Sequence, residues 1–167
     1  YSSWQLLRGV TGRLLQFIKA AREGWSKRAS SKPTKLTLNL KIDDIDKNKT
    51  LLNHSPLPAQ LVMEAELMLI RVSQYDSHKD EIQDLHAKQK IPRSSKLWRF
   101  RPFWDEQDSV IRITGRVPSA DLIVLPKDHQ IVDKFVKWTH NSLHHLSPLP
   151  LRNRIQDLGF ILVGGIK

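Results

Sequence analysis

Two histidines late in the chain have the side chains and spacing of a metal site. His140 and His145 lie in the segment Trp-Thr-His-Asn-Ser-Leu-His-His. A neutral imidazole is a common zinc ligand, but a structural zinc site needs four ligands, and the chain has no cysteine. Neighbouring histidines are also often exposed side chains that bind nothing. The pair therefore indicates at most half of a zinc site.

Helix geometry leaves the second ligand open. On an uninterrupted helix His140 and His144 are four residues apart and share a face, whereas His145 is rotated away from His140. If the helix ends between positions 140 and 145, the chain can turn and bring His145 back. The choice between His144 and His145 therefore depends on where the helix ends.

Other catalytic chemistry has no motif in this sequence. There is no nucleophile elbow, no His-Glu-x-x-His, no phosphate-binding glycine loop and no cysteine nucleophile. We therefore name no catalytic residues.

The charge favours a polyanionic partner. The formal net charge is +10, and residues 1–41 hold nine Lys or Arg against a single acid, Glu23. Clustered cations bind phosphates and release counterions. The candidate nucleic-acid-binding residues are Arg8, Arg13, Lys19, Arg22, Arg99 and Arg101. A membrane-surface helix or a solvated tether are the alternatives for the N-terminal cations.

The sequence predicts two helices joined by a linker in the first half of the chain. Residues 1–25 carry apolar side chains at steps of three and four with a basic face between them, and residues 26–55 shift to Lys, Ser, Thr and Pro. A second helix starts near Ser55 and Pro56, and Asp80–His86 adds a short one. The apolar stripe expected on the second helix is Leu61, Ala65, Met68, Val72 and Tyr75. No apolar run is long enough to span a membrane, so we expect no transmembrane helix. A membrane is not among the partners we expect.

A β-hairpin is expected after Pro92. Its strands would be 97–101 and 110–114, joined by the acidic turn 105–108. The aromatic residues here are Trp98, Phe100, Phe103 and Trp104. They either stack on nucleic-acid bases or build a small core under the hairpin, and the core is the interpretation we favour.

Two further helices are expected near the end of the chain. The first begins from Pro126 with Ile131, Phe135 and Trp138 on one face, and the second begins at Ser147 and Pro148 and ends at Gly159. The fold class is therefore α+β and mainly α-helical, with a helical connector, a small hairpin and a helix-turn-helix-like pair.

Short blocks of sequence follow one another in a characteristic order. They lie at 4–8, 13–18, 57–71, 91–97, 102–106, 112–117, 125–129 and 138–145. In content and order these blocks resemble the polyprotein of BEL/Pao-type long-terminal-repeat retrotransposons, in the segment between ribonuclease H and the integrase zinc-binding domain. The likeness covers nearly the whole chain, and 26–55 is its least informative part.

The resemblance implies a function and a domain plan. It divides the chain into a basic helix (1–25), a linker (26–55), a connector with hairpin (56–122) and an incomplete zinc-binding domain (123–167). In that family the domain binds Zn²⁺ through a His-His-Cys-Cys set, for which His140 and His145 match the histidines. The cysteines would lie beyond Lys167, so this segment alone is not expected to hold zinc stably.

The resemblance implies a non-catalytic role for this segment, because in that family the integrase catalytic core lies in the following domain; the intact polyprotein would be an enzyme. The implied role is support of DNA integration through binding of element-end DNA and self-association of integrase or the polyprotein, in the nucleus and cytoplasm. The alternatives are a metal-independent basic nucleic-acid-binding module and a degenerate element remnant without activity.

Overall fold

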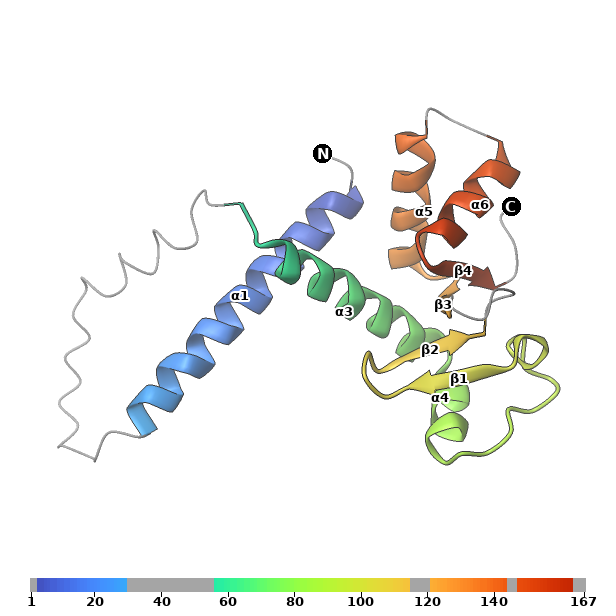
Figure 1. The fold of residues 1–167 in the computed structure, drawn as a ribbon, viewed down its shortest axis with the longest axis horizontal. Coiled ribbons are helices and arrows are strands. Elements are labelled where there is room, and N and C mark those ends of the chain that lie inside the picture. The colour runs from blue at the N-terminus through green and yellow to red at the C-terminus, as the bar shows by residue number, and fades with distance from the viewer. Residues whose placement is uncertain (1–2, 30–55, 115–120, 144–146, 164–167) are drawn as a thin grey trace. The chain divides into compact units, whose positions relative to one another are not determined.

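The computed structural model describes residues 3–29, 56–114, 121–143 and 147–163, with side chains described to residue 23 in the first range. These residues form helices α1 (Ser3–Ala29), α3 (Ala59–Ser77), α4 (Lys79–His86), α5 (Gln130–Ser142) and α6 (Pro148–Asp157), and the short 3-10 helix η1 (Trp98–Phe100). The strands are β1 (Pro102–Asp105), β2 (Val110–Ile113), β3 (Leu122–Pro126) and β4 (Phe160–Val163). The described residues are thus mixed α+β (Figure 1), and none of their helices is long and apolar enough to cross a bilayer.

The chain divides into two compact units. One contains residues 1–6 and 66–167, and the other contains residues 7–65. In the smaller unit, α1 approaches the chain before α3 closely at Gly12. A Cβ at Gly12 would lie 3.0 Å from a methyl carbon of Leu57, so glycine permits this packing.

The larger unit is built on one sheet with strand order β1-β2-β3-β4. β1 pairs with β2, and β2 with β3, antiparallel, whereas β4 pairs with β3 in parallel. The connection from β3 to β4 runs through α5 and α6, as a parallel pair requires a crossover. β1 and β2 lie in the expected connector (56–122) and β4 lies in the expected zinc-binding domain (123–167), so one sheet contains strands from both segments.

Both faces of this sheet are covered. One face carries a core cluster that includes Ile111, Ile113, Val124, Ile161 and Val163, packed with residues of α4 and of the loop after it. The other face carries Leu125 and Phe160, which border a small cavity together with Trp4, Ile70 and Phe135. Trp4 is 1% exposed and meets the Phe135 ring edge to face at 5.2 Å.

The structure corrects the first strand of the hairpin. The pairing of Pro102 with Ile113 through Asp105 with Val110 confirms the hairpin and its acidic turn. The expected strand at 97–101 is wrong, because Trp98–Phe100 form η1 and Arg101 has a left-handed backbone, with φ 49°. A left-handed residue ends an extended run, so the strand begins only at Pro102.

The buried face of α3 also differs from the expected stripe. Leu61 and Ala65 are buried as expected, but Met68, Val72 and Tyr75 are 37%, 42% and 47% exposed. In the larger unit the buried face of α3 consists instead of Leu69, Ile70, Ser73 and Gln74. Two of these side chains are polar, so a count of apolar residues selects the wrong face.

Gln74 is buried because it takes part in the sheet. Its side-chain Nε2 donates to the Ile111 oxygen at 3.1 Å and to the Val124 oxygen at 2.7 Å, and its Oε1 accepts from the Ile111 nitrogen at 2.7 Å. Direct pairing of β2 with β3 covers Arg112 with Ile123 and Ile113 with Leu122. The Gln74 amide therefore takes the place of the next strand pair and fixes α3 to both strands.

Candidate metal and nucleic-acid sites

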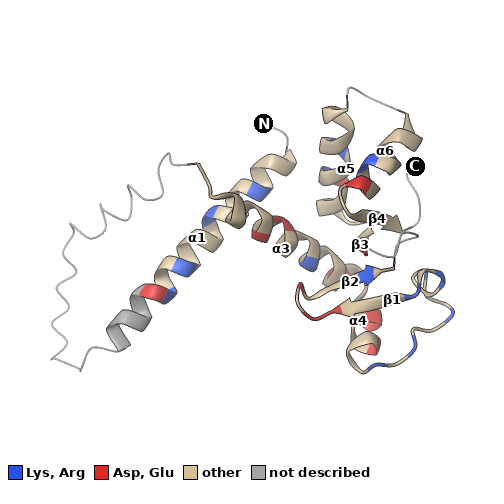
Figure 2. Ribbon diagram, in the orientation of Figure 1, with Lys and Arg blue, Asp and Glu red and all other residues tan. Residues whose placement is uncertain are grey.

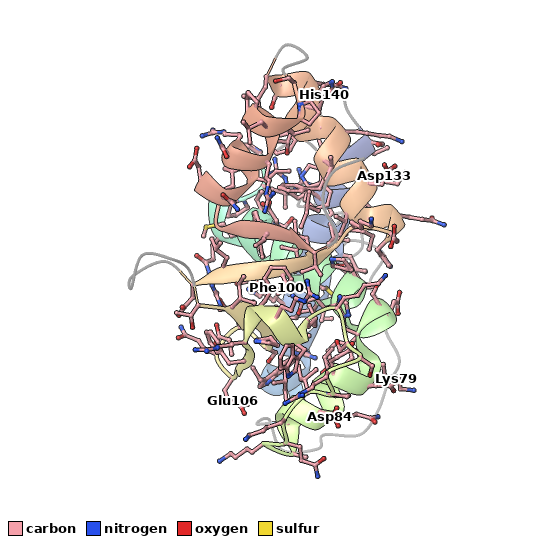
Figure 3. All side chains as sticks on the ribbon, turned by 90° about the vertical axis from the view of Figure 1, so that its right-hand side faces the viewer. Lys79, Asp84, Phe100, Glu106, Asp133 and His140 are labelled. Carbon is pink, nitrogen blue, oxygen red and sulfur yellow. The ribbon has the colours of Figure 1, made fainter. Side chains whose placement is uncertain are left out.

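The His145 assignment depends on where α5 ends. α5 ends at Ser142, with Leu143 as its C-cap. His140 lies in the last turn of α5 and is partly buried (Figure 3). A helix end between the two histidine positions is thus observed.

The rest of the proposed zinc site is not in view. His144 and His145 lie outside the described residues. Within the ranges that are described, no group of three or more His, Cys, Asp or Glu side chains is placed to hold a metal ion. Of the two histidines expected to bind zinc, only His140 lies among the described residues.

The helix pair around this site forms as expected. α6 begins at Pro148 after the N-cap residue Ser147, and Leu151 and Ile155 are 4% and 1% exposed. Leu158 is 39% exposed and lies past the helix end, where Gly159 takes a φ of 88°. The pair is positioned by the sheet, because β3 precedes α5 and β4 follows α6.

The cations expected on α1 differ in their surroundings. Lys19 forms an ion pair with Glu64 at 2.7 Å, and Arg13 donates to Gln16 at 3.2 Å. Arg22 is exposed, whereas Arg8 is partly buried. At least one of these positive charges, that of Lys19, is therefore neutralised by an ion pair within the smaller unit.

α1 also exposes apolar side chains. Val10, Leu14 and Phe17 are 60%, 52% and 57% exposed, at steps of four and three along the helix. Within the described part of the smaller unit, these three apolar side chains of α1 are thus open to solvent.

A second group of cations lies between α4 and β1, in the segment 87–101, here called the basic loop. It contains six Lys or Arg and no acid, and all six side chains are exposed. Figure 2 shows these cations as blue along the chain from α4 to β1, while α4 itself carries acidic residues. The six are Lys88, Lys90, Arg93, Lys96, Arg99 and Arg101. Only the last two were identified from the sequence, although six cations without an acid were a readable signal.

The aromatic residues beside the basic loop separate into two kinds. Phe100 and Trp104 pack against the core cluster, and Trp104 also contacts the His86 ring at 4.3 Å. This confirms the core interpretation for these two. Trp98 is 44% exposed and has the Arg93 guanidinium 5.5 Å above its ring. It is the aromatic residue here that is open for stacking.

Trp98 borders an open pocket of about 260 Å³. Leu85, Ile91 and Pro102 provide apolar lining, and the exposed side chains of Gln89, Lys90 and Arg101 complete it. A pocket with an apolar lining and a few polar groups is the usual form of a small-ligand site.

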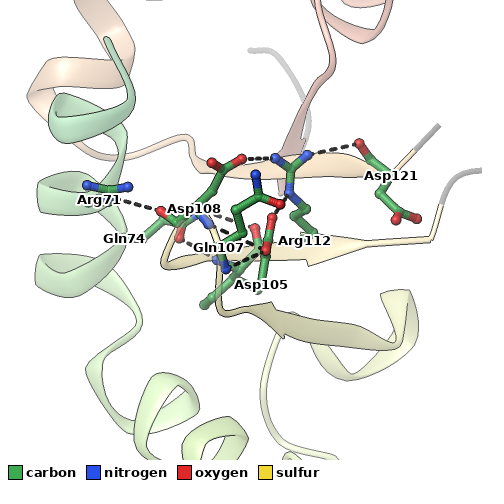
Figure 4. Close-up of polar contacts among 8 residues, drawn as sticks. Arg71, Gln74, Asp105, Gln107, Asp108, Arg112 and Asp121 are labelled. Carbon is green, nitrogen blue, oxygen red and sulfur yellow. Dashed lines mark hydrogen bonds and ion pairs between the residues drawn. The ribbon is translucent and has the colours of Figure 1, made fainter. Parts of the chain in front are cut away.

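The charged residues of the hairpin form hydrogen bonds and ion pairs with one another around the acidic turn. Arg112 donates to Asp105 at 2.6 Å and to Asp108, and Arg71 donates to the Asp108 carbonyl oxygen at 2.7 Å (Figure 4). Burial alone would raise the pKa of Asp105, but hydrogen bonds from Arg112 and from two backbone N–H groups lower it below its ordinary value. This network stabilises the acidic turn.

Comparison with known proteins gives no relative for these sites. No protein-family model, no curated protein and no solved structure matches the chain.

Proposed function

We propose that this chain is a non-catalytic, DNA-binding part of a retrotransposon polyprotein, which leads into and begins the integrase zinc-binding domain. It would support integration by binding element-end DNA and by self-association. The proposal rests on the order of the sequence blocks that resemble BEL/Pao-type polyproteins.

The end of α5 is the structural observation that supports it. His140 lies in the last helical turn, and α5 ends at Ser142, before position 145. In the proposed site, an imidazole on either side of this helix end would bind one shared ion. The zinc would hold the α5–α6 pair, and the two thiolates would come from residues after Lys167.

The coding sequence that follows Lys167 tests this proposal. We expect two cysteines, two residues apart, within a few tens of residues of His145. A stop codon or loss of frame before any cysteine pair would contradict the proposal and would favour a degenerate element remnant.

The second candidate is a basic nucleic-acid-binding module that needs no metal. The six exposed cations of the basic loop favour it, because they lie away from the end of α5 and on a different element. Salt-dependent DNA binding that survives the change of both His140 and His145 to Ala would support this candidate. Loss of binding in that double variant would count against it.

A further inference from the structure

The basic loop has an ordered backbone. Ile91 and Leu97 are 7% and 0% exposed and anchor it in the core. Between them, Ser95 donates to Glu81 at 2.7 Å and accepts from the Leu97 nitrogen at 3.1 Å. The exposed cations are therefore held on a fixed frame, which lowers the entropy cost of binding a ligand.

Both ends of this loop place a cation where glycine is favoured. At the start, Lys88 has φ 55° and closes α4: its N–H bonds the Leu85 oxygen at 3.1 Å, and the Gln89 N–H bonds the Asp84 oxygen at 2.8 Å. This is a Schellman motif, in which glycine is the usual left-handed residue. At the other end Arg101 has φ 49°. Stability alone would favour glycine at both positions.

The pocket combines three recognition elements. Trp98 offers an aromatic surface, Lys90 and Arg101 offer positive charge, and Gln89 offers an amide. In the described part of the chain none of the six loop cations pairs with a carboxylate, since the ion pairs there involve other residues. An aromatic ring beside unpaired cations suits an anionic ligand with a flat ring.

We propose that this pocket binds single-stranded nucleic acid. One unpaired base stacks on Trp98, and Lys90 and Arg101 contact the phosphates on either side of it. An exposed aromatic ring within a cationic groove is the device by which proteins bind single strands without sequence preference. In a duplex the bases are stacked and paired, so the ring of Trp98 would have no free base to contact.

This inference rests on the nucleic-acid part of the proposed function and is independent of zinc. It gives the pocket one ligand class, whose source can be DNA or RNA. The phosphate contacts predict salt-dependent binding, with a log–log slope of about −0.7 for each phosphate contacted on a single strand.

The test is fluorescence anisotropy of the full chain with labelled oligo(dT), labelled oligo(rU) and a labelled blunt-ended DNA duplex. We expect both single strands to bind more tightly than the duplex. Trp98→Ala should weaken single-strand binding roughly tenfold, whereas Trp98→Phe should retain most of it. Phe17→Ala is the matched control, since Phe17 is 57% exposed on α1 and should have no effect.

A second variant separates binding from folding. Arg101→Gly removes a phosphate contact but relieves the left-handed backbone, so its thermal midpoint should not fall while the salt slope becomes smaller by about 0.7. Arg152→Gln removes one exposed cation from α6 and should leave binding nearly unchanged.

The outcomes are distinguishable. Preference for the duplex, or equal binding by Trp98→Ala and the unmodified chain, overturns the inference while the proposed DNA-binding function stands. If none of the three probes binds at low salt, both the inference and the nucleic-acid part of the proposed function are wrong. Discrimination between oligo(dT) and oligo(rU) in the unmodified chain identifies the source of the ligand and supports the inference.

Discussion

Replacement of Gln74 by Leu should destabilise the larger unit severely. The side chain is fully buried and makes three hydrogen bonds, two at 2.7 Å and one at 3.1 Å, to the backbones of Ile111 and Val124. Leu fills a similar volume but leaves one buried N–H and two buried carbonyl groups without this partner. Each unsatisfied group costs about 1–3 kcal/mol, so we expect a loss of about 3 kcal/mol or more.

Urea denaturation followed by circular dichroism measures this loss. A single domain has only about 5–15 kcal/mol of stability, so the effect is large. Gln83→Leu is the matched control, because Gln83 is exposed on α4 and its change should stay within about 0.5 kcal/mol. Gln74→Glu should also destabilise at neutral pH, because a carboxylate would face two carbonyl oxygens. A Gln74→Leu variant as stable as the Gln83→Leu control would refute the role of Gln74 as a link between β2 and β3.

Three further predictions concern stability. Burial lowers the pKa of His78 from 6.5; Glu81 opposes this shift and Lys96 adds to it. Because the unfolded chain therefore binds the proton at a higher pH than the folded chain, the unfolding free energy should decrease as the pH falls below 6.5. Denaturation at several pH values measures this decrease, which should be smaller in His78→Asn. Trp4→Ala should lower the unfolding free energy by about 3–5 kcal/mol in a denaturant titration, because Trp4 is 1% exposed. Trp4→Phe should lower it much less, since the buried Trp4 Nε1 has no hydrogen-bond partner among the described residues that a Phe would lose. Lys88→Gly should leave the thermal midpoint of unfolding unchanged or raise the stability by up to about 1 kcal/mol, and a clear decrease would contradict the strain assigned to its φ of 55°.

The elements with a clear period could be predicted from the sequence. α1, α4, α6 and the second strand of the hairpin follow from apolar spacing, from capping residues or from alternation. β3 and β4 could not be found in this way. Their sequences, Leu-Ile-Val-Leu-Pro and Phe-Ile-Leu-Val, are continuous apolar runs, as expected of strands covered on both faces, and such runs show no alternation.

The sequence also could not show which polar and aromatic residues are buried. Gln74 and Ser73 are fully buried because their partners come from distant strands and from the preceding turn, and no local pattern shows this. Trp98 and Phe100 are two residues apart, yet the first is exposed and the second packs on the core, because they lie in a 3-10 turn and not in a strand. The sequence identified Arg99 and Arg101, but only the structure brings Trp98, Lys90 and Arg101 to one pocket.

Zinc binding by a product that continues past Lys167 through the expected cysteine pair tests the proposed function most directly. Isothermal titration with Zn²⁺, together with the visible spectrum of the Co²⁺ form, should show one tetrahedral ion per chain and a gain in helicity. His140→Ala should abolish this binding, and His129→Ala should not, since His129 caps the start of α5 at the opposite end of that helix. Absence of one-to-one binding, or equal binding by His140→Ala, would contradict the proposal.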